Sequence, residues 1–208
     1  MQKLKKLLES NKLRLILSVF FCIKVSAAIA AVIPVDSEKG QTQFRAIGRP
    51  SAIKISGQGL GPKGSLELAK DGDQYQISGV LEVDLESLKT GIELRDTHMK
   101  EKYLETGKDK TARLILVNAN LKAALVESGG SQELTAQLKL HGVEKPTQVS
   151  VQFNPSGGKL QVHAQFVVSM TDHQIPVPNW AGITVANRVE VEVTTEVDQS
   201  KLMTEAKN

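Results

Sequence analysis

The sequence predicts an all-β fold, a closed antiparallel barrel or a β-sandwich, with one short helix. From Gln43 onward apolar and polar residues alternate with a period of two, as on strands with one buried and one wet face. Short turn signals rich in Gly, Asp and Ser separate these runs, so consecutive strands are expected to be antiparallel neighbours. About eight such strands with little helix between them are typical of barrels and sandwiches. A dense charged block at residues 90–105 interrupts the alternation.

The first thirty residues read as an export signal. A cationic start, an apolar run at residues 15–23 and the small-x-small pattern Ala28-Ile29-Ala30 are its three parts. The alternative is an uncleaved anchor, but the run is about half of the ~20 residues that span a bilayer. We therefore expect cleavage after Ala30 and a periplasmic or secreted domain over residues 31–208, without a stable membrane span. Residues 200–208 are polar enough to form a frayed tail.

Removal of this signal changes the charge of the chain. The full sequence has 26 Lys and Arg against 23 Asp and Glu, and residues 1–30 hold six of the former and one of the latter. The mature part is therefore mildly acidic, which removes the main support for nucleic-acid binding. The only cysteine, Cys22, lies in the signal, so the mature chain can form no internal disulfide.

The expected strands follow one another along the chain from residue 44. The longer candidates are Leu81–Leu85, Leu134–Leu140, Val149–Phe153, Val162–Met170 and Val189–Val193, and the shorter ones are Phe44–Ala46, Ala52–Ser56, Ser65–Ala69, Tyr75–Val80 and Arg113–Asn118. Turn signals at residues 70–73, 128–131 and 155–158 are short enough for hairpins.

The charged block predicts a short helix, or lid, around residues 94–106. Met99 and Tyr103 have the i,i+4 spacing of one helix face, so they are expected to face inward and plug a barrel end. Asp96 is placed near the helix start, where a carboxylate accepts from free backbone N–H groups. Two roles stay open for Arg95, Asp96 and His98: a polar clamp that holds the lid, or contacts to a ligand headgroup.

No pattern in the sequence predicts catalysis. The mature chain has no cysteine nucleophile and no Gly-x-Ser-x-Gly elbow. Residues 59–64 match Gly-x-Gly-x-x-Gly, but they contain a proline and connect two strands, so no helix N-terminus is available for a dinucleotide. We expect a flexible hairpin or a bulge there, and no enzyme and no cofactor.

The mature histidines predict no metal site, because no two of them have a ligand spacing such as His-x-x-x-His. His141 is expected to be a turn residue before Gly142 whose ring satisfies backbone groups at the strand end. The loop Ile175–Gly182 carries the only tryptophan, Trp180, and several apolar side chains. It should fold over a barrel end, as a second plug or as the gate of a lipid entrance.

Four segments resemble one known family. They are Val83–Gly91, Leu94–Met99, Leu138–Pro146 with its His-Gly-x-x-Lys-Pro turn, and Phe166–His173 followed by Ile175 and Pro176. In this order they resemble the YceI-like family. Two departures are a missing histidine in Asp36–Gln41 and Gly107–Thr111 where many members have Tyr-Pro. The resemblance implies an exported, single antiparallel lipocalin-like β-barrel of about eight strands that binds a polyisoprenoid or another long-chain lipid.

The resemblance implies that apolar side chains inside the barrel bind a long-chain lipid or isoprenoid. The candidate ligand-binding residues are Leu81, Val83, Leu85, Leu116, Leu138, Leu140, Val151, Phe166, Val168, Met99, Tyr103 and Trp180. The alternative is a structural or interaction barrel filled by its own side chains, since the expected core contains mostly small residues. A homodimer is also left open.

Overall fold

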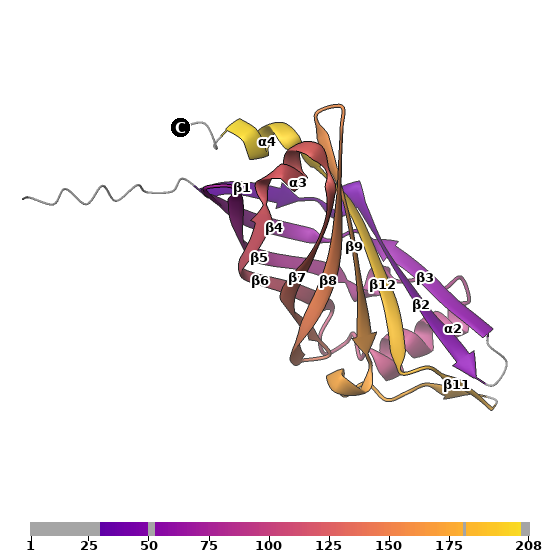
Figure 1. The fold of residues 1–208 in the computed structure, drawn as a ribbon. Coiled ribbons are helices and arrows are strands. Elements are labelled where there is room, and N and C mark those ends of the chain that lie inside the picture. The colour runs from indigo at the N-terminus through magenta and orange to yellow at the C-terminus, as the bar shows by residue number, and fades with distance from the viewer. Residues whose placement is uncertain (1–29, 50–52, 181, 205–208) are drawn as a thin grey trace, which may run out of the picture.

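The computed structural model describes residues 30–49, 53–180 and 182–204. The predicted signal lies outside these residues, apart from Ala30. The described chain forms one sheet of twelve strands that curls around an apolar interior (Figure 1). No helix in the described ranges is long and apolar enough to cross a bilayer.

The strands are long and the helices short. The strands are β1 (Ala30–Val35), β2 (Gly40–Arg49), β3 (Ile53–Leu60), β4 (Lys63–Asp71), β5 (Gln74–Asp84), β6 (Thr111–Lys122), β7 (Gly130–Leu140), β8 (Val143–Ser156), β9 (Lys159–Ser169), β10 (Asn179–Trp180), β11 (Ile183–Val185) and β12 (Arg188–Asp198). The helices are α2 (Glu93–His98), α3 (Ala123–Ser128), α4 (Gln199–Thr204) and the π-helix η3 (Met99–Tyr103), with 3₁₀ turns η1 (Ser37–Lys39), η2 (Leu85–Ser87) and η4 (Thr171–His173).

Every strand pair in the sheet is antiparallel. The order is β1-β4-β5-β6-β7-β8-β9-β12-β2-β11-β10, and β3 pairs with the other side of β2. Strands β4 to β9 are thus sequential neighbours, while β12 lies between β9 and β2 and joins the end of the chain to its start. The all-β class, the antiparallel sheet and the helical lid are confirmed.

The number of strands exceeds the expected eight or so. Two candidates, Tyr75–Val80 and Leu81–Leu85, belong largely to the single strand β5, which contains a register shift between Ile77 and Gly79. Strand β1 precedes the first expected strand, and β10 and β11 have only two and three residues. Such short strands leave no alternation to detect.

Two of the three expected hairpins are confirmed, those joining β4 to β5 and β8 to β9. The expected hairpin at residues 128–131 is wrong, because the helix α3 separates β6 from β7. Ala123 and Val126 bury one face of this helix, and Gly129 ends it with a φ of 80°. Residues 199–204 form α4 rather than a frayed tail, since Leu202 is only 4% exposed and packs into the core.

Two buried clusters fill most of the interior. The helix-end cluster, next to α3 and α4, comprises Ala31, Ile33, Leu68, Tyr75, Ile77, Leu116, Leu121, Ala123, Val126, Leu134, Ala136, Val149, Val151, Phe153, Leu160 and Leu202. The lid-end cluster comprises Leu85, Leu88, Leu138, Leu140, Val168, Met170 and Ile175. Leu114 and Phe166 pack against both clusters. Each end of the curled sheet is therefore closed by a different set of short helices.

Candidate functional site

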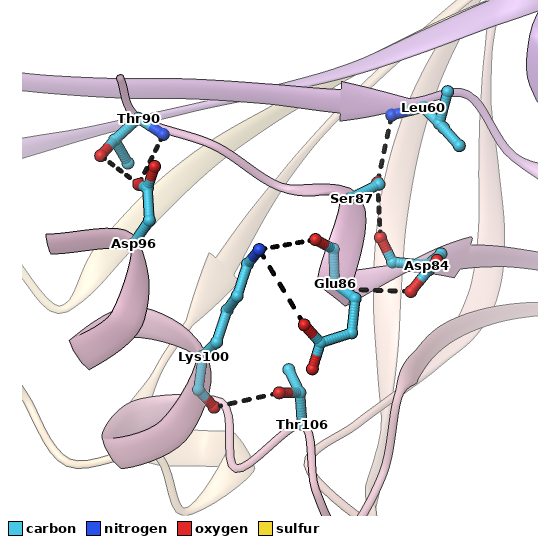
Figure 2. Close-up of polar contacts among 8 residues, drawn as sticks. All are labelled: Leu60, Asp84, Glu86, Ser87, Thr90, Asp96, Lys100 and Thr106. Atoms are coloured by element: carbon cyan, nitrogen blue, oxygen red, sulfur yellow. Dashed lines mark hydrogen bonds and ion pairs between the residues drawn. The ribbon is translucent and has the colours of Figure 1, made fainter. Parts of the chain in front are cut away.

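The site begins where the free edge of β3 meets the segment that follows β5. Gln58 and Lys89 form one antiparallel bridge, in which each backbone N–H donates to the other residue's carbonyl at 2.8 Å. Ser87 lies beside it: its hydroxyl accepts from the backbone N–H of Leu60 at 3.1 Å and donates to the carbonyl of Asp84 at 2.6 Å (Figure 2). These contacts join β3 to the segment before the lid.

Two glycines of β3 allow this close approach. A Cβ on Gly57 would lie 2.4 Å from Phe44 Cζ and 2.7 Å from the carbonyl oxygen of Lys89. A Cβ on Gly59 would lie 2.6 Å from Ser87 Oγ. The Gly-x-Gly-x-x-Gly string thus serves backbone packing. Its centre, Gly61 and Pro62, is a buried link and not a hairpin turn, because β3 and β4 pair with different strands.

A pocket of about 800 Å³ lies at this junction. Its inward-facing apolar residues are Phe44, Phe166 and Val191 of β2, β9 and β12, which also pack against the lid-end cluster, and Val167 lines it from the outer face. Polar residues share the lining, which comprises Gln43, Phe44, Arg45, Ser56, Gly57, Gln58, Lys89, Thr90, Gly91, Gln165, Phe166, Val167, Glu190, Val191 and Glu192. The lining is thus mixed, with more polar than apolar residues, and the volume is within the usual range of small-molecule sites.

Thr90 connects the pocket to the lid. Its backbone N–H donates to Asp96 Oδ1 at 2.7 Å, and its hydroxyl donates to the same oxygen (Figure 2). Arg95 donates to the Thr90 hydroxyl from Nε at 2.8 Å and to the Thr90 carbonyl at 3.0 Å. Two of the three predicted clamp residues, Arg95 and Asp96, therefore hold one pocket residue.

The balance of these contacts keeps Asp96 ionised. Burial, the largest single effect, raises the pKa of the carboxyl, but the two hydrogen bonds from Thr90 and the nearby Lys100 and Arg95 charges together lower it below its ordinary value. Asp96 does accept a backbone N–H, as expected, although the donor precedes the helix. The N-cap residue of α2 is Ile92, which has no side-chain cap.

The second half of the lid is tied to η2. Lys100 Nζ donates to the carbonyl of Glu86 at 2.6 Å and lies 3.9 Å from the Glu86 carboxylate (Figure 2). The carbonyl of Lys100 accepts from the backbone N–H of Thr106 at 2.9 Å. On the inner side, Met99, Tyr103 and Leu104 pack against the lid-end cluster. The lid therefore closes this end with apolar side chains, as expected.

A latch holds the residue where the lid ends. His141 Nε2 lies 2.8 Å from the Glu105 carboxylate, and His141 Nδ1 lies 3.1 Å from the carbonyl of His173. The carbonyl and the carboxylate oxygen both only accept, so each contact requires a proton on the ring nitrogen that makes it. Hydrogen bonds from Lys108, first, and from His141 lower the pKa of the Glu105 carboxyl. The role expected for His141 at the strand end is confirmed, and the contact with Glu105 adds the lid to it.

The histidines and carboxylates are dispersed. His141 and His173 belong to the latch, His98 is exposed on α2, and His163 Nε2 lies 2.9 Å from a Glu192 carboxylate oxygen. Within the described ranges, no group of three or more His, Cys, Asp or Glu side chains is placed to hold a metal ion.

The structure distributes the candidate ligand residues over the pocket, the two buried clusters and the strands β5 and β10. Phe166 lines the pocket. Leu85, Leu138, Leu140 and Val168 belong to the lid-end cluster, on which Met99 and Tyr103 pack, whereas Leu116 and Val151 belong to the helix-end cluster. Leu81 and Val83 are half-buried on β5. The backbone of Trp180 is part of β10, and its side chain lies outside the described atoms.

Sequence reasoning missed most of the pocket. Phe44 is within an expected strand and Val191 within another, but only the pairing of β12 with β2 brings them together. Thr90 and Gly91 were assigned to the charged block and not to a pocket wall. The loop after β9 contributes Ile175 and Val177 to the lid end, which supports its role as a second plug.

Comparisons with known proteins agree on one family and one fold. The family model described as YceI-like domain matches residues 34–197. A polyisoprenoid binding domain from Saccharophagus degradans, implicated in plant cell wall breakdown, is 16% identical and has a TM-score of 0.60, covering 82% of this chain and 99% of that chain. BcnA of Burkholderia cenocepacia is 15% identical and has a TM-score of 0.61, covering 78% and 98%. No curated protein matches the chain.

Proposed function

The chain belongs to the YceI-like family, and from this premise we propose that it binds a long apolar chain in the pocket beside the lid. The ligand class is an isoprenoid or a fatty-acid derivative. The observation that carries the proposal is the pocket of about 800 Å³, whose inward-facing apolar side chains are Phe44, Phe166 and Val191. The relative from Saccharophagus degradans, described as a polyisoprenoid binding domain, supports the same ligand class.

Burial supplies the binding free energy in this proposal. Each CH₂ group removed from water contributes roughly 0.8 kcal/mol, so ten groups contribute about 8 kcal/mol before the entropy losses of binding. The polar part of the lining orients the ligand. Lys89 and Thr90 face the polar headgroup of the ligand. Arg95 and Asp96 do not contact the ligand but hold Thr90 in place through hydrogen bonds. No catalytic step is part of this function.

Export is a further part of the proposal, and it depends on the N-terminal signal. Cleavage after Ala30 removes one residue of β1, which forms the terminal register pair with Ala69. The rest of β1 keeps its pairing with β4. Intact mass measurement of the protein from its own cell envelope should give a chain that starts at Ala31. A full-length chain in the cytoplasm would exclude export.

The second candidate function is a structural or interaction barrel with a self-filled core. One observation favours it: eight of the candidate ligand residues, in the clusters or on β5, are placed away from the pocket and help to fill the interior. In this case the pocket is an open surface hollow that binds no lipid, and the outer faces of the barrel contact a partner.

Native mass spectrometry separates the two candidates. The protein is purified from its own envelope, and an isoprenoid quinone is then added to the delipidated sample. The proposal predicts a co-purified lipid and a stable complex with the quinone. A protein that never carries a lipid and does not retain the quinone would leave the self-filled barrel as the better description.

A further inference from the structure

The end of the β2–β3 hairpin combines exposed apolar side chains with unpaired cations. Ile47 and Ile53 are 48% and 40% exposed, although both are large aliphatic residues. Arg49 and Lys54 are exposed, and neither has an ion-pair partner in the ranges that the structure describes. With Ile183 of β11 they form what we call the tip surface. It lies at the end of the sheet away from α3 and α4 (Figure 1).

The tip surface occupies both faces of the paired ends of β2 and β3. Strand β11 pairs with the end of β2, so that Thr184 lies opposite Arg49. A Cβ on Gly48 would lie 2.9 Å from Ile183 Cγ2 and 3.5 Å from Ile53 Cβ. Ile53 and Ile183 therefore share the face of Gly48, opposite to the face of Ile47. Ile47 lies opposite Lys54 in the register of β2 and β3, which places an apolar and a cationic side chain together on the outer face.

Charge is separated between the tip and the rest of the molecule. Residues 46–57, at the tip, contain Arg49 and Lys54 and no Asp or Glu, and residues 173–189 contain one Arg and no acid, whereas Arg45 further along β2 lies 3.7 Å from the Glu190 carboxylate. The mature chain as a whole has more acidic than basic residues, so the opposite charge is carried by the other strands and the lid. A surface of opposite charge, rich in anionic groups and with an apolar layer beneath them, is the partner that this end complements.

The tip surface also adjoins the pocket. Phe44 and Arg45 of β2 and Ser56 of β3 line the pocket, and Ile47 and Ile53 lie about three residues further along the same strands. At roughly 3.3 Å per residue, the two features are about 10 Å apart. Ile92 and Leu94, which follow the pocket residue Gly91, are exposed as well.

We propose that the tip surface docks on an anionic membrane. Ile47 and Ile53 enter the boundary between headgroups and acyl chains, and Arg49 and Lys54 contact lipid phosphates. This contact goes beyond ligand binding in the pocket and does not require it. It brings the pocket mouth to the membrane surface, so that a long apolar ligand can move between the membrane and the pocket without crossing water.

The test is binding of the mature protein to vesicles of phosphatidylcholine, with and without phosphatidylglycerol. Wild-type protein should bind the anionic vesicles and bind the neutral ones far less. Replacing both cations, in Arg49→Gln with Lys54→Gln, should lower the partition coefficient about fivefold per cation. Ile47→Ser with Ile53→Ser should lower it about tenfold. The matched control combines Lys70→Gln with Val117→Ser, where Val117 is 70% exposed on a distant strand, and should bind as wild type.

Two results would overturn the proposal. One is equal vesicle binding by the wild type, the tip variants and the control. The other is a wild-type dimer, seen by light scattering, that the tip substitutions dissociate without an effect on vesicle binding, because the tip would then contact a second copy of the chain. Far-ultraviolet circular dichroism of each variant verifies that the sheet is intact.

Discussion

At the scale of single residues, Gly57 determines how closely the lid segment approaches β3. We predict that Gly57→Ala destabilises the protein by about 1–3 kcal/mol, because its Cβ meets the backbone carbonyl of Lys89, which cannot rotate away. Urea unfolding followed by circular dichroism measures this free energy. The same substitution should weaken ligand binding, since Phe44 and Lys89 both line the pocket.

Gly107→Ala is the matched control for this substitution. A Cβ there meets nothing within 4 Å, and Gly107 does not need a positive φ. Its free energy of unfolding should change by less than about 0.5 kcal/mol. If the two alanine variants were equally stable, the close contact at Gly57 would not limit the packing of β3.

Asp96 is the second residue whose role can be measured. We predict that Asp96→Asn lowers the free energy of unfolding by about 1–2 kcal/mol at pH 7, because the neutral amide loses the charge-assisted bonds from Thr90 and the attraction of Arg95 and Lys100. The folded-state pKa of Asp96 is lowered, so its contribution is complete above the ordinary carboxyl pKa of about 4 and is lost as the pH falls through the lower folded value.

Urea unfolding from pH 7 down to pH 3 measures this dependence. The gap between wild type and Asp96→Asn should narrow as the pH falls below about 4. Glu101→Gln, an exposed change on the same lid, should leave stability unaffected at every pH. A gap that stays constant with pH would mean that the Asp96 charge does not stabilise the lid.

At the scale of elements, the latch holds the end of the lid to the β7–β8 turn. We predict that His141→Asn speeds hydrogen exchange at the backbone amides of Leu104 and Thr106 by about tenfold, because the contact with Glu105 is lost. Asn is a suitable replacement, since His141 has a φ of 52° and Asn tolerates this left-handed conformation. Hydrogen exchange read by nuclear magnetic resonance measures the effect.

Lys108→Gln serves as the control, because it removes the other ion pair of Glu105. That pair is an exposed i,i+3 contact and should contribute little. If His141→Asn and Lys108→Gln accelerated hydrogen exchange equally, or if neither accelerated it, His141 would not hold the lid.

Sequence patterns were sufficient to predict some of the strands and helices, but not all of them. The spacing of Met99 and Tyr103 predicted the inner face of the lid, and the alternation along residues 134–140 and 162–170 predicted β7 and β9. The helix α3 was missed because it is six residues long and has only two buried residues to mark a helical period. The partner of Asp96 was missed because Thr90 is in a loop, whose path no periodicity describes.

At the scale of the whole molecule, the sheet was predictable and its closure was not. Phe166, one of the candidate ligand-binding residues, lines the pocket from an expected strand. Phe44 and Val191 became pocket residues only through the pairing of β2 with β12, which are separated by more than a hundred residues. The bridge between Gln58 and Lys89 is equally non-local, so the sequence alone could not place the pocket beside the lid.

The affinity for an isoprenoid quinone, measured by isothermal titration calorimetry with the delipidated mature protein, tests most directly whether this pocket binds the ligand. Val191→Phe adds a ring to the apolar part of the pocket and should lower the affinity more than about tenfold. Val117→Phe, on an exposed position of β6, should bind as the wild type does. Quinone binding by the wild type that Val191→Phe abolishes is the predicted result, whereas no binding by the wild type, or equal binding by both variants, would contradict it.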